Sequence, residues 1–77
     1  MIRGFVLVNT QIGQAPAIAA EMRAFHEVLS ADVVIGPYDV VAIISVPDTA
    51  ALNTLVNKKI HEIEGVKQTI TMLSIES

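Results

Sequence analysis

Two threonines separated by one residue place a pair of hydroxyl groups near the C-terminal end of the chain. If Thr69 and Thr71 lie in a β-strand, both side chains point to the same face of the sheet. Two hydroxyls in that arrangement can together bind an anionic group such as a carboxylate. Threonine also favours strands because of its branched shape, so the residues alone leave a binding role and a structural role open.

A second candidate is the carboxylate of Asp39, which closes the segment Gly36-Pro37-Tyr38-Asp39 between two strongly apolar stretches. It lies beside the single tyrosine of the chain, and a carboxylate there is suited to bind the ammonium group of a ligand. Glycine, proline and aspartate are also common turn residues for backbone reasons. On the residues alone, the turn-forming interpretation of Asp39 is favoured.

The remaining residue types give no sign of catalytic or metal chemistry. The histidines His26 and His61 lack further histidine, aspartate or glutamate residues at the spacing that metal sites favour; His61 is followed only by Glu62 and Glu64. We therefore interpret both histidines as solvated helix residues. The absence of cysteine excludes thiolate zinc sites, iron–sulfur clusters and cysteine nucleophiles. Neither a glycine-rich phosphate loop nor a serine-nucleophile motif occurs. We therefore expect no catalytic residue, no metal and no cofactor.

The balance of charge argues against nucleic acid and membrane as direct partners. The net charge is −3, and the five basic residues are spread along the chain without forming a basic face. No apolar run approaches the ~18–20 residues of a membrane span. The N-terminus lacks a secretory signal, and together with the absence of cysteine this predicts a cytoplasmic protein.

The composition is unusually apolar for so short a chain. Apolar residues make up 52% of its 77 residues and charged residues only 17%, against about 25% charged in typical domains. This length predicts a single domain, residues 1–77, which buries only about 60–65% of its unfolded surface and has a marginal core. We therefore expect the surplus apolar surface to be covered by self-assembly.

The expected elements alternate in type along the chain. A strand from Ile2 to Asn9 precedes a helix that has Pro16 in its first turn and an apolar stripe at Ile18, Met22, Phe25 and Leu29. Strands from Ala31 to Ile35 and from Val40 to Val46 form a hairpin. A second helix is capped by Asp48, with Leu52, Val56, Ile60 and Ile63 on one side and Gly65 just past its end. The last strand runs from Val66 to Glu76.

This order predicts an α+β fold of the ferredoxin-like kind, a βαββαβ sandwich. Its four-stranded antiparallel sheet carries two helices on one face. The apolar residues Phe5, Leu7, Ile43 and Leu73 cannot all point towards those helices. An uncovered apolar sheet face is an aggregation hazard, so we expect the sheet to pack on another subunit.

Several of these features follow one another in a fixed order. They are the turn Gly36-Pro37-Tyr38-Asp39, the strand Val40 to Val46, the helix after Asp48, and Gly65-Val66 with Thr69 and Thr71 downstream. In this order and spacing the chain resembles, over nearly its whole length, the effector-binding domain of the leucine-responsive (Lrp/AsnC) transcriptional regulators. The resemblance implies the ferredoxin-like fold of the dimeric α/β-barrel type, dimers formed through the sheets, and rings of eight or ten subunits.

The resemblance also implies a site and a role. Family ligands are mostly amino acids bound between dimers near the turn, and motif matching carries the ligand-binding role to Gly36, Tyr38, Asp39, Thr69 and Thr71. Because Met1 leads directly into the first strand, we expect a stand-alone effector domain without the family's helix-turn-helix domain. Such a protein is expected to modulate transcription indirectly, with full-length Lrp/AsnC-type regulators as candidate partners.

Two other functions stay open at this point. One is a small enzyme of the dimeric α/β-barrel kind, in which only Asp39, His26 or His61 is available as an acid or base. The other is a purely structural oligomerisation module that alters the assembly of its relatives.

Overall fold

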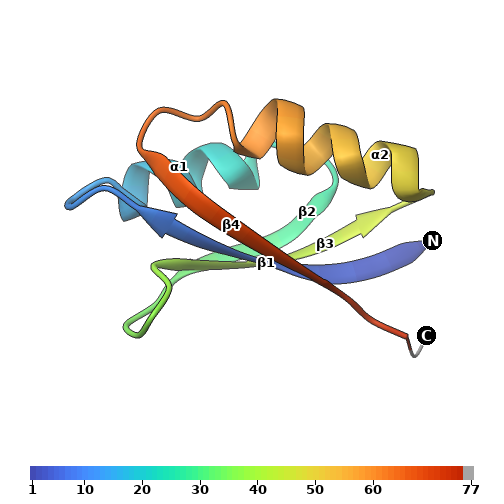
Figure 1. Cartoon of the computed structure of the whole chain (residues 1–77), viewed down its shortest axis with the longest axis horizontal. Helices are drawn as coiled ribbons and strands as arrows, with labels where there is room; N and C mark the ends of the chain where they lie inside the picture. Colours follow the sequence, from blue (N-terminus) through green and yellow to red (C-terminus); the bar gives the residue numbers. More distant parts are fainter. Residues whose placement is uncertain (76–77) are drawn as a thin grey trace.

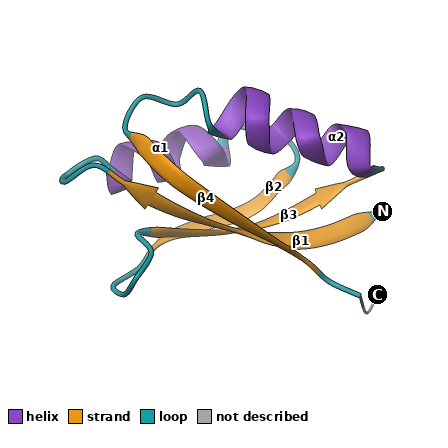
Figure 2. Ribbon diagram, viewed as in Figure 1, coloured by secondary structure: helices purple, strands orange, loops and turns teal. Residues whose placement is uncertain are grey.

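In the described part of the chain, four strands form one antiparallel sheet, and the helical segments lie on one face of it (Figures 1 and 2). The computed structural model describes residues 1–75. Its elements are β1 (Ile2–Thr10), α1 (Ala15–Arg23), β2 (Val28–Val33), β3 (Val40–Val46), α2 (Thr49–Asn53), the π-helix η1 (Thr54–Ile60) and β4 (Val66–Leu73). The strand order is β2-β3-β1-β4. The predicted ferredoxin-like fold is confirmed.

The core lies between the sheet and the helices. β1 and β3 are the two central strands, which explains why they are apolar at nearly every position. Along β3 the residues alternate between buried and half-buried, so one side of the strand faces the helices and the other does not. The fully buried larger side chains of the core are Val6, Val8, Ile18, Met22, Val40, Ile44, Val46, Leu55 and Ile60.

The first helix is shorter than its apolar stripe predicts. Pro16 lies in the first turn as expected, but α1 ends at Arg23, before Phe25 and Leu29. The amides of Ala24 and Phe25 donate to carbonyl groups three residues earlier, which tightens the chain into a turn. The second strand therefore begins at Val28 and not at Ala31, and it ends at Val33 and not at Ile35. Leu29 lies at an irregularity of this edge strand and is exposed.

The second helix begins as predicted and then changes type. Asp48 is its N-cap, since the carboxylate accepts a 2.8 Å hydrogen bond from the amide of Ala51. From Thr54 the helix is π-helical, and the amide of His61 donates to the carbonyl of Val56, five residues earlier. Leu55 and Ile60 are both fully buried although they are five residues apart. An α-helix would rotate them apart by about 140°, and the wider π turns bring both to the core.

Gly65 does not directly follow the helix, which ends at Ile60. It lies instead in the turn before β4, with a φ of +99° that favours glycine. Its carbonyl accepts a 2.8 Å hydrogen bond from the amide of Gln11. A Cβ at this position would be 3.2 Å from side-chain atoms of Gln14 and Ile18. The glycine therefore joins the start of β4 closely to the loop before α1.

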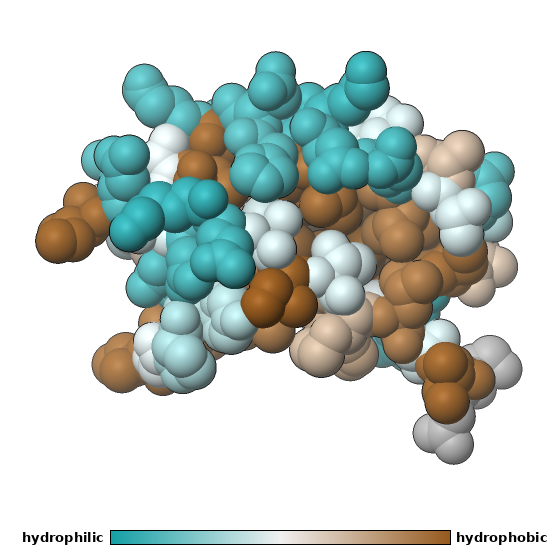
Figure 3. Space-filling model, viewed as in Figure 1, coloured by the Kyte–Doolittle hydropathy of each residue, from teal (hydrophilic) through white to brown (hydrophobic). Residues whose placement is uncertain are grey.

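Within residues 1–75, one face of the sheet carries no helix. We call the apolar residues of this face, Phe5, Leu7, Val41, Ile43, Ile70 and Met72, the outer sheet face; they are neighbours in the strand register. Phe5 is 37% exposed and Met72 48% exposed. Leu73 pairs with the buried Gly4, so it lies on the helix side and not on this face. Hydrophilic residues cover the helices at the top of Figure 3, whereas apolar residues gather lower, along the sheet.

The last strand, β4, ends at Leu73, and the predicted end at Glu76 lies outside the described residues. Among residues 1–75, no helix is long and apolar enough to cross a membrane.

Candidate ligand site

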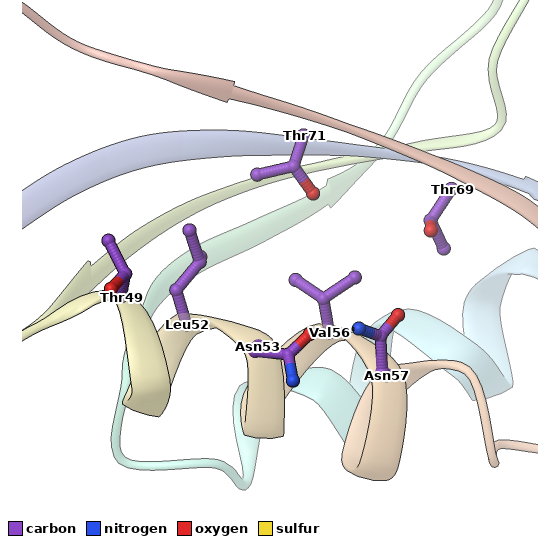
Figure 4. A pocket seen from close by; sticks show the side chains of 7 residues that line it. All are labelled: Thr49, Leu52, Asn53, Val56, Asn57, Thr69 and Thr71. Carbon is purple, nitrogen blue, oxygen red and sulfur yellow. Dashed lines mark hydrogen bonds between the residues drawn. The ribbon is translucent and has the colours of Figure 1, made fainter.

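A groove lies between the edge strand β4 and the helical segment formed by α2 and η1 (Figure 4). Its volume is about 360 Å³, within the range of about 300–1,000 Å³ usual for small-molecule sites. The residues that line it are Thr49, Leu52, Asn53, Val56, Asn57, Thr69 and Thr71. The two threonines of β4 are shorter than the leucine and isoleucine side chains of the core, so the space between strand and helix stays open.

The strand register places both threonines in this groove. Thr69 pairs with Val8 and Thr71 with Val6, and both valines are fully buried on the helix side of the sheet. The prediction that the two hydroxyls share a face is therefore correct. Both residues are half-buried, so their hydroxyls remain accessible from the groove.

The opposite wall carries polar residues that the sequence prediction missed. Thr49, Asn53 and Asn57 lie four residues apart along the helical segment, and all three line the groove. The Nδ2 group of Asn57 donates a hydrogen bond to Oδ1 of Asn53. Their four-residue spacing, beside the apolar positions Leu52 and Val56, is the signal that identifies this stripe in the sequence.

None of the described residues that line the groove carries a charge. Hydroxyl and carboxamide groups form its polar part, while Leu52 and Val56 form an apolar floor. Such a lining has donors and acceptors for a small polar or zwitterionic molecule. It contains no side chain that exchanges a proton near neutral pH, so the groove is suited to binding.

The predicted turn residues lie elsewhere. Gly36 and Pro37 are exposed in the connection between β2 and β3, and Tyr38 and Asp39 are half-buried there. None of them lines the groove. In Figure 1 this connection lies at the lower left, on the side of the sheet away from the helices. Within one chain, therefore, the structure does not bring the turn together with Thr69 and Thr71.

Asp39 has a structural role in this turn. Its Oδ2 atom accepts hydrogen bonds from the amide of Thr10, at 2.8 Å, and from the hydroxyl of Thr10, at 3.3 Å. Its own amide donates to the carbonyl of Val8 at 2.9 Å. These bonds attach the turn to the end of β1. Its Oδ1 atom takes part in neither of the two carboxylate bonds.

Outside the groove, the carboxylate of the buried Glu27 contacts the side chains of Lys59 and His26. Glu27 Oε2 lies 3.0 Å from Lys59 Nζ, and Oε1 lies 3.5 Å from Nδ1 of the exposed His26. Burial acts to raise the pKa of Glu27, but the hydrogen bond and charge of Lys59, with smaller effects from the Glu27 backbone amide and His26, outweigh it. The pKa of Glu27 is therefore below its ordinary value. Over residues 1–75, no cluster of three or more potential metal ligands occurs.

Together, the strand order and the helix arrangement define a small domain of the ferredoxin-like fold, with an uncharged groove beside its edge strand. The family described as the Lrp/AsnC ligand binding domain matches residues 3–77. The chain belongs to this family.

Solved structures agree with this assignment. The chain is similar to the protein TTHA0845 of Thermus thermophilus, with 31% identity and a TM-score of 0.95, over 100% of this chain and 96% of that one. It is similar to the hypothetical protein PHS023 of Pyrococcus horikoshii, with 27% identity and a TM-score of 0.92, over 100% and 93% of the two chains.

A longer relative shares the fold. The Neisseria meningitidis transcriptional regulator NMB0573, solved in complex with L-Met, is 22% identical, with a TM-score of 0.88 over 99% of this chain and 51% of the regulator. This chain therefore spans about half the length of that regulator. No curated protein matches the chain.

Proposed function

We propose that residues 1–77 act as one effector-binding and oligomerisation domain, which senses an amino acid and modulates transcription through partner regulators. The observation that carries this proposal is the uncharged groove lined by Thr69 and Thr71, in a chain that belongs to a ligand-binding family. An amino acid is a zwitterion, and the two hydroxyls are suited to bind its carboxylate. The L-Met complex of the Neisseria regulator supports this class of ligand.

The turn residues Gly36, Tyr38 and Asp39 join the same site from a neighbouring subunit. Because the turn and the groove are separate within one chain, a ligand that contacts both must lie between two copies. Asp39 Oδ2 is engaged by Thr10, which leaves Oδ1 to accept a hydrogen bond from the ligand's ammonium group. Asp39 then both holds the turn and binds the ligand.

The outer sheet face supports the proposal that the chains must assemble before they bind the ligand. Its side chains are apolar and partly exposed in the single chain, and a second copy packed against them would remove that surface from water. We propose that two chains pair through this face and that such dimers join into an octamer or decamer. A ligand that binds only the assembled form stabilises it by mass action.

The test is a thermal-unfolding screen with each of the twenty amino acids at millimolar concentration, combined with a native mass measurement. A ligand at a hundred times its Kd adds about 2.7 kcal/mol, which raises the Tm of a domain this size by several degrees. Thr71→Val is expected to abolish that rise, whereas Thr54→Val, which removes an exposed hydroxyl outside the groove, is expected to preserve it. A Tm that no amino acid changes would contradict the proposal.

The same screen separates the two other functions. The structural-module alternative predicts stable oligomers that no amino acid affects. No observation favours the enzyme alternative, since the groove lining offers neither an acid nor a base.

A further inference from the structure

Two charged residues of opposite sign flank the outer sheet face. Among the residues that the strand register pairs, the charged ones are Arg3 on β1 and Asp32 on β2. Arg3 pairs with Ser45 and Asp32 with Val41, and both of these β3 residues belong to the half-buried set that alternates with the core. Both charges therefore lie on the side of the sheet away from the helices. Both residues are exposed in the single chain.

The two charges are too far apart to pair within one chain. Strand β3 separates β1 from β2, and Arg3 is level with Ser45 whereas Asp32 is level with Val41. With strands about 4.8 Å apart and residues about 3.4 Å apart along each strand, the separation is roughly 16 Å. In Figure 1, β1 starts at the right and the connection after β2 lies at the lower left. Within residues 1–75, neither side chain makes an ion pair.

The strand register places Ile43 midway between the two charges. Ile43 lies on β3, the strand between β1 and β2, and it is also halfway from Ser45 to Val41. Consider two sheets packed face to face, with a two-fold axis between them that passes through Ile43 and is perpendicular to the line from Arg3 to Asp32. This axis places Arg3 of each copy opposite Asp32 of the partner subunit. Each charge thereby meets an opposite charge that it does not meet within one chain.

The same axis matches the apolar residues to one another. At the strand spacings given above, it crosses β1 between Phe5 and Leu7 and reaches β4 at Ile70. Phe5 of one copy then faces Val41 of the partner subunit, and Leu7 faces Met72 of the partner subunit. The strands of the two copies cross steeply, as in the orthogonal class of sheet packing. The charges and the apolar residues therefore favour the same orientation.

We propose that the outer sheet face binds a second copy of this chain about this axis, with Arg3 of each copy paired to Asp32 of the partner subunit. This inference rests on the proposed function, since it takes the outer sheet face as the contact between two chains, and it adds how the two copies are oriented. An orientation that placed Arg3 opposite its own copy would bring like charges together, which disfavours it.

The experiment reverses each charge on the full chain and measures dimer dissociation by sedimentation equilibrium. Arg3→Glu and Asp32→Arg each place like charges opposite one another at both ends of the contact, so each is expected to weaken pairing about tenfold or more. The combined variant restores opposite charges and is expected to pair within about threefold of the parent. Asp32→Arg also makes the chain less negative, so general charge repulsion alone would strengthen its pairing.

Lys58→Glu and Glu21→Arg are the matched controls. They make the same charge reversals at exposed positions of η1 and α1, on the helical side of the sheet. Both are expected to pair as the parent does.

A mixture of the two single variants tests whether the contact is reciprocal. A chain with Arg3→Glu beside a chain with Asp32→Arg has opposite charges at both ends of the contact, whereas each variant beside its own copy has like charges at both. Native mass spectrometry separates these dimers by mass. The mixed dimer is expected to exceed clearly the share that random pairing gives.

Two results would overturn this inference while leaving the proposed function intact. One is a mixed dimer at the share of random pairing, and the other is a combined variant that pairs as weakly as the single variants. A parent chain that stays monomeric would instead refute the proposed assembly, and the inference with it.

Discussion

At the scale of single residues, some side chains act within their own element and others connect segments that are far apart in the sequence. Asp48 caps a helix whose first turn begins at the next residue, so its role follows from short-range chemistry. The pair of Glu27 and Lys59 joins residues 32 positions apart, and no local pattern connects them. The same distinction applies to the site, because Thr69 and Thr71 share a face by strand geometry, whereas their neighbours Asn53 and Asn57 depend on how the helix packs.

The buried Glu27 predicts a pH dependence of stability. Because its pKa is lowered in the folded chain, the stability it contributes is fully present above the ordinary glutamate pKa of about 4.3. That contribution is lost as the pH falls through the lower pKa of the folded state. Glu27→Gln is expected to lower the free energy of unfolding by about 1 kcal/mol at pH 7, because Lys59 stays partly exposed.

Urea unfolding of both proteins between pH 7 and pH 3 measures this effect. The difference between parent and variant should shrink as the pH falls, since the parent then also loses its ion pair. A difference that is constant over this range would contradict the assigned role of Glu27.

At the scale of elements, the order of the strands and helices is predictable, but the π-helical type of η1 and several ends are not. β3 has the predicted bounds because valine at each end adjoins a turn residue or proline. The apolar spacing predicts too late an end for α1, because Phe25 and Leu29 continue that spacing after the helix has ended at Arg23. The π-helix has no local signal, since it results from packing Leu55 and Ile60 together against the sheet.

Two glycines allow the turn before β4 to be tested against a matched control. Gly13 and Gly65 both have positive φ, of +82° and +99°, but a Cβ at Gly13 meets nothing within 4 Å, whereas one at Gly65 meets Gln14 and Ile18. Gly13→Ala is expected to cost about 1 kcal/mol from backbone strain alone. Gly65→Ala should cost about 1–3 kcal/mol more, because steric crowding adds to the strain. Equal unfolding free energies for the two variants would show that the turn relaxes without cost.

At the scale of the whole molecule, composition predicts the outer sheet face and the structure locates it. A short chain with more apolar residues than its core can bury leaves some of them at the surface. The alternation of side chains along the strands assigns these to Phe5, Leu7 and their neighbours. The groove was not predictable in the same way, because it results from how far a helix extends over an edge strand. The predicted contact between the turn and the threonines stays a prediction about the assembly.

A charge on the outer sheet face is expected to dissociate the assembly. Met72 is 48% exposed in the single chain, so Met72→Glu leaves the fold intact but places a carboxylate in the proposed contact. An unpaired charge in a buried interface costs about 3–5 kcal/mol, which weakens association by more than a hundredfold. Sedimentation should show smaller species for Met72→Glu and parent-like oligomers for Ile12→Glu, a substitution in an exposed loop. Parent-like oligomers of Met72→Glu would exclude this face as the contact.

The most direct test of an effector site in the groove is a crystal structure of the chain grown with the amino acid that raises its Tm most in the thermal-unfolding screen. We predict the ligand between β4 and the α2–η1 segment, with its carboxylate at the hydroxyls of Thr69 and Thr71 and the turn of a neighbouring subunit closing the site. A ligand bound elsewhere, or a groove filled by side chains of a second copy, would contradict the account.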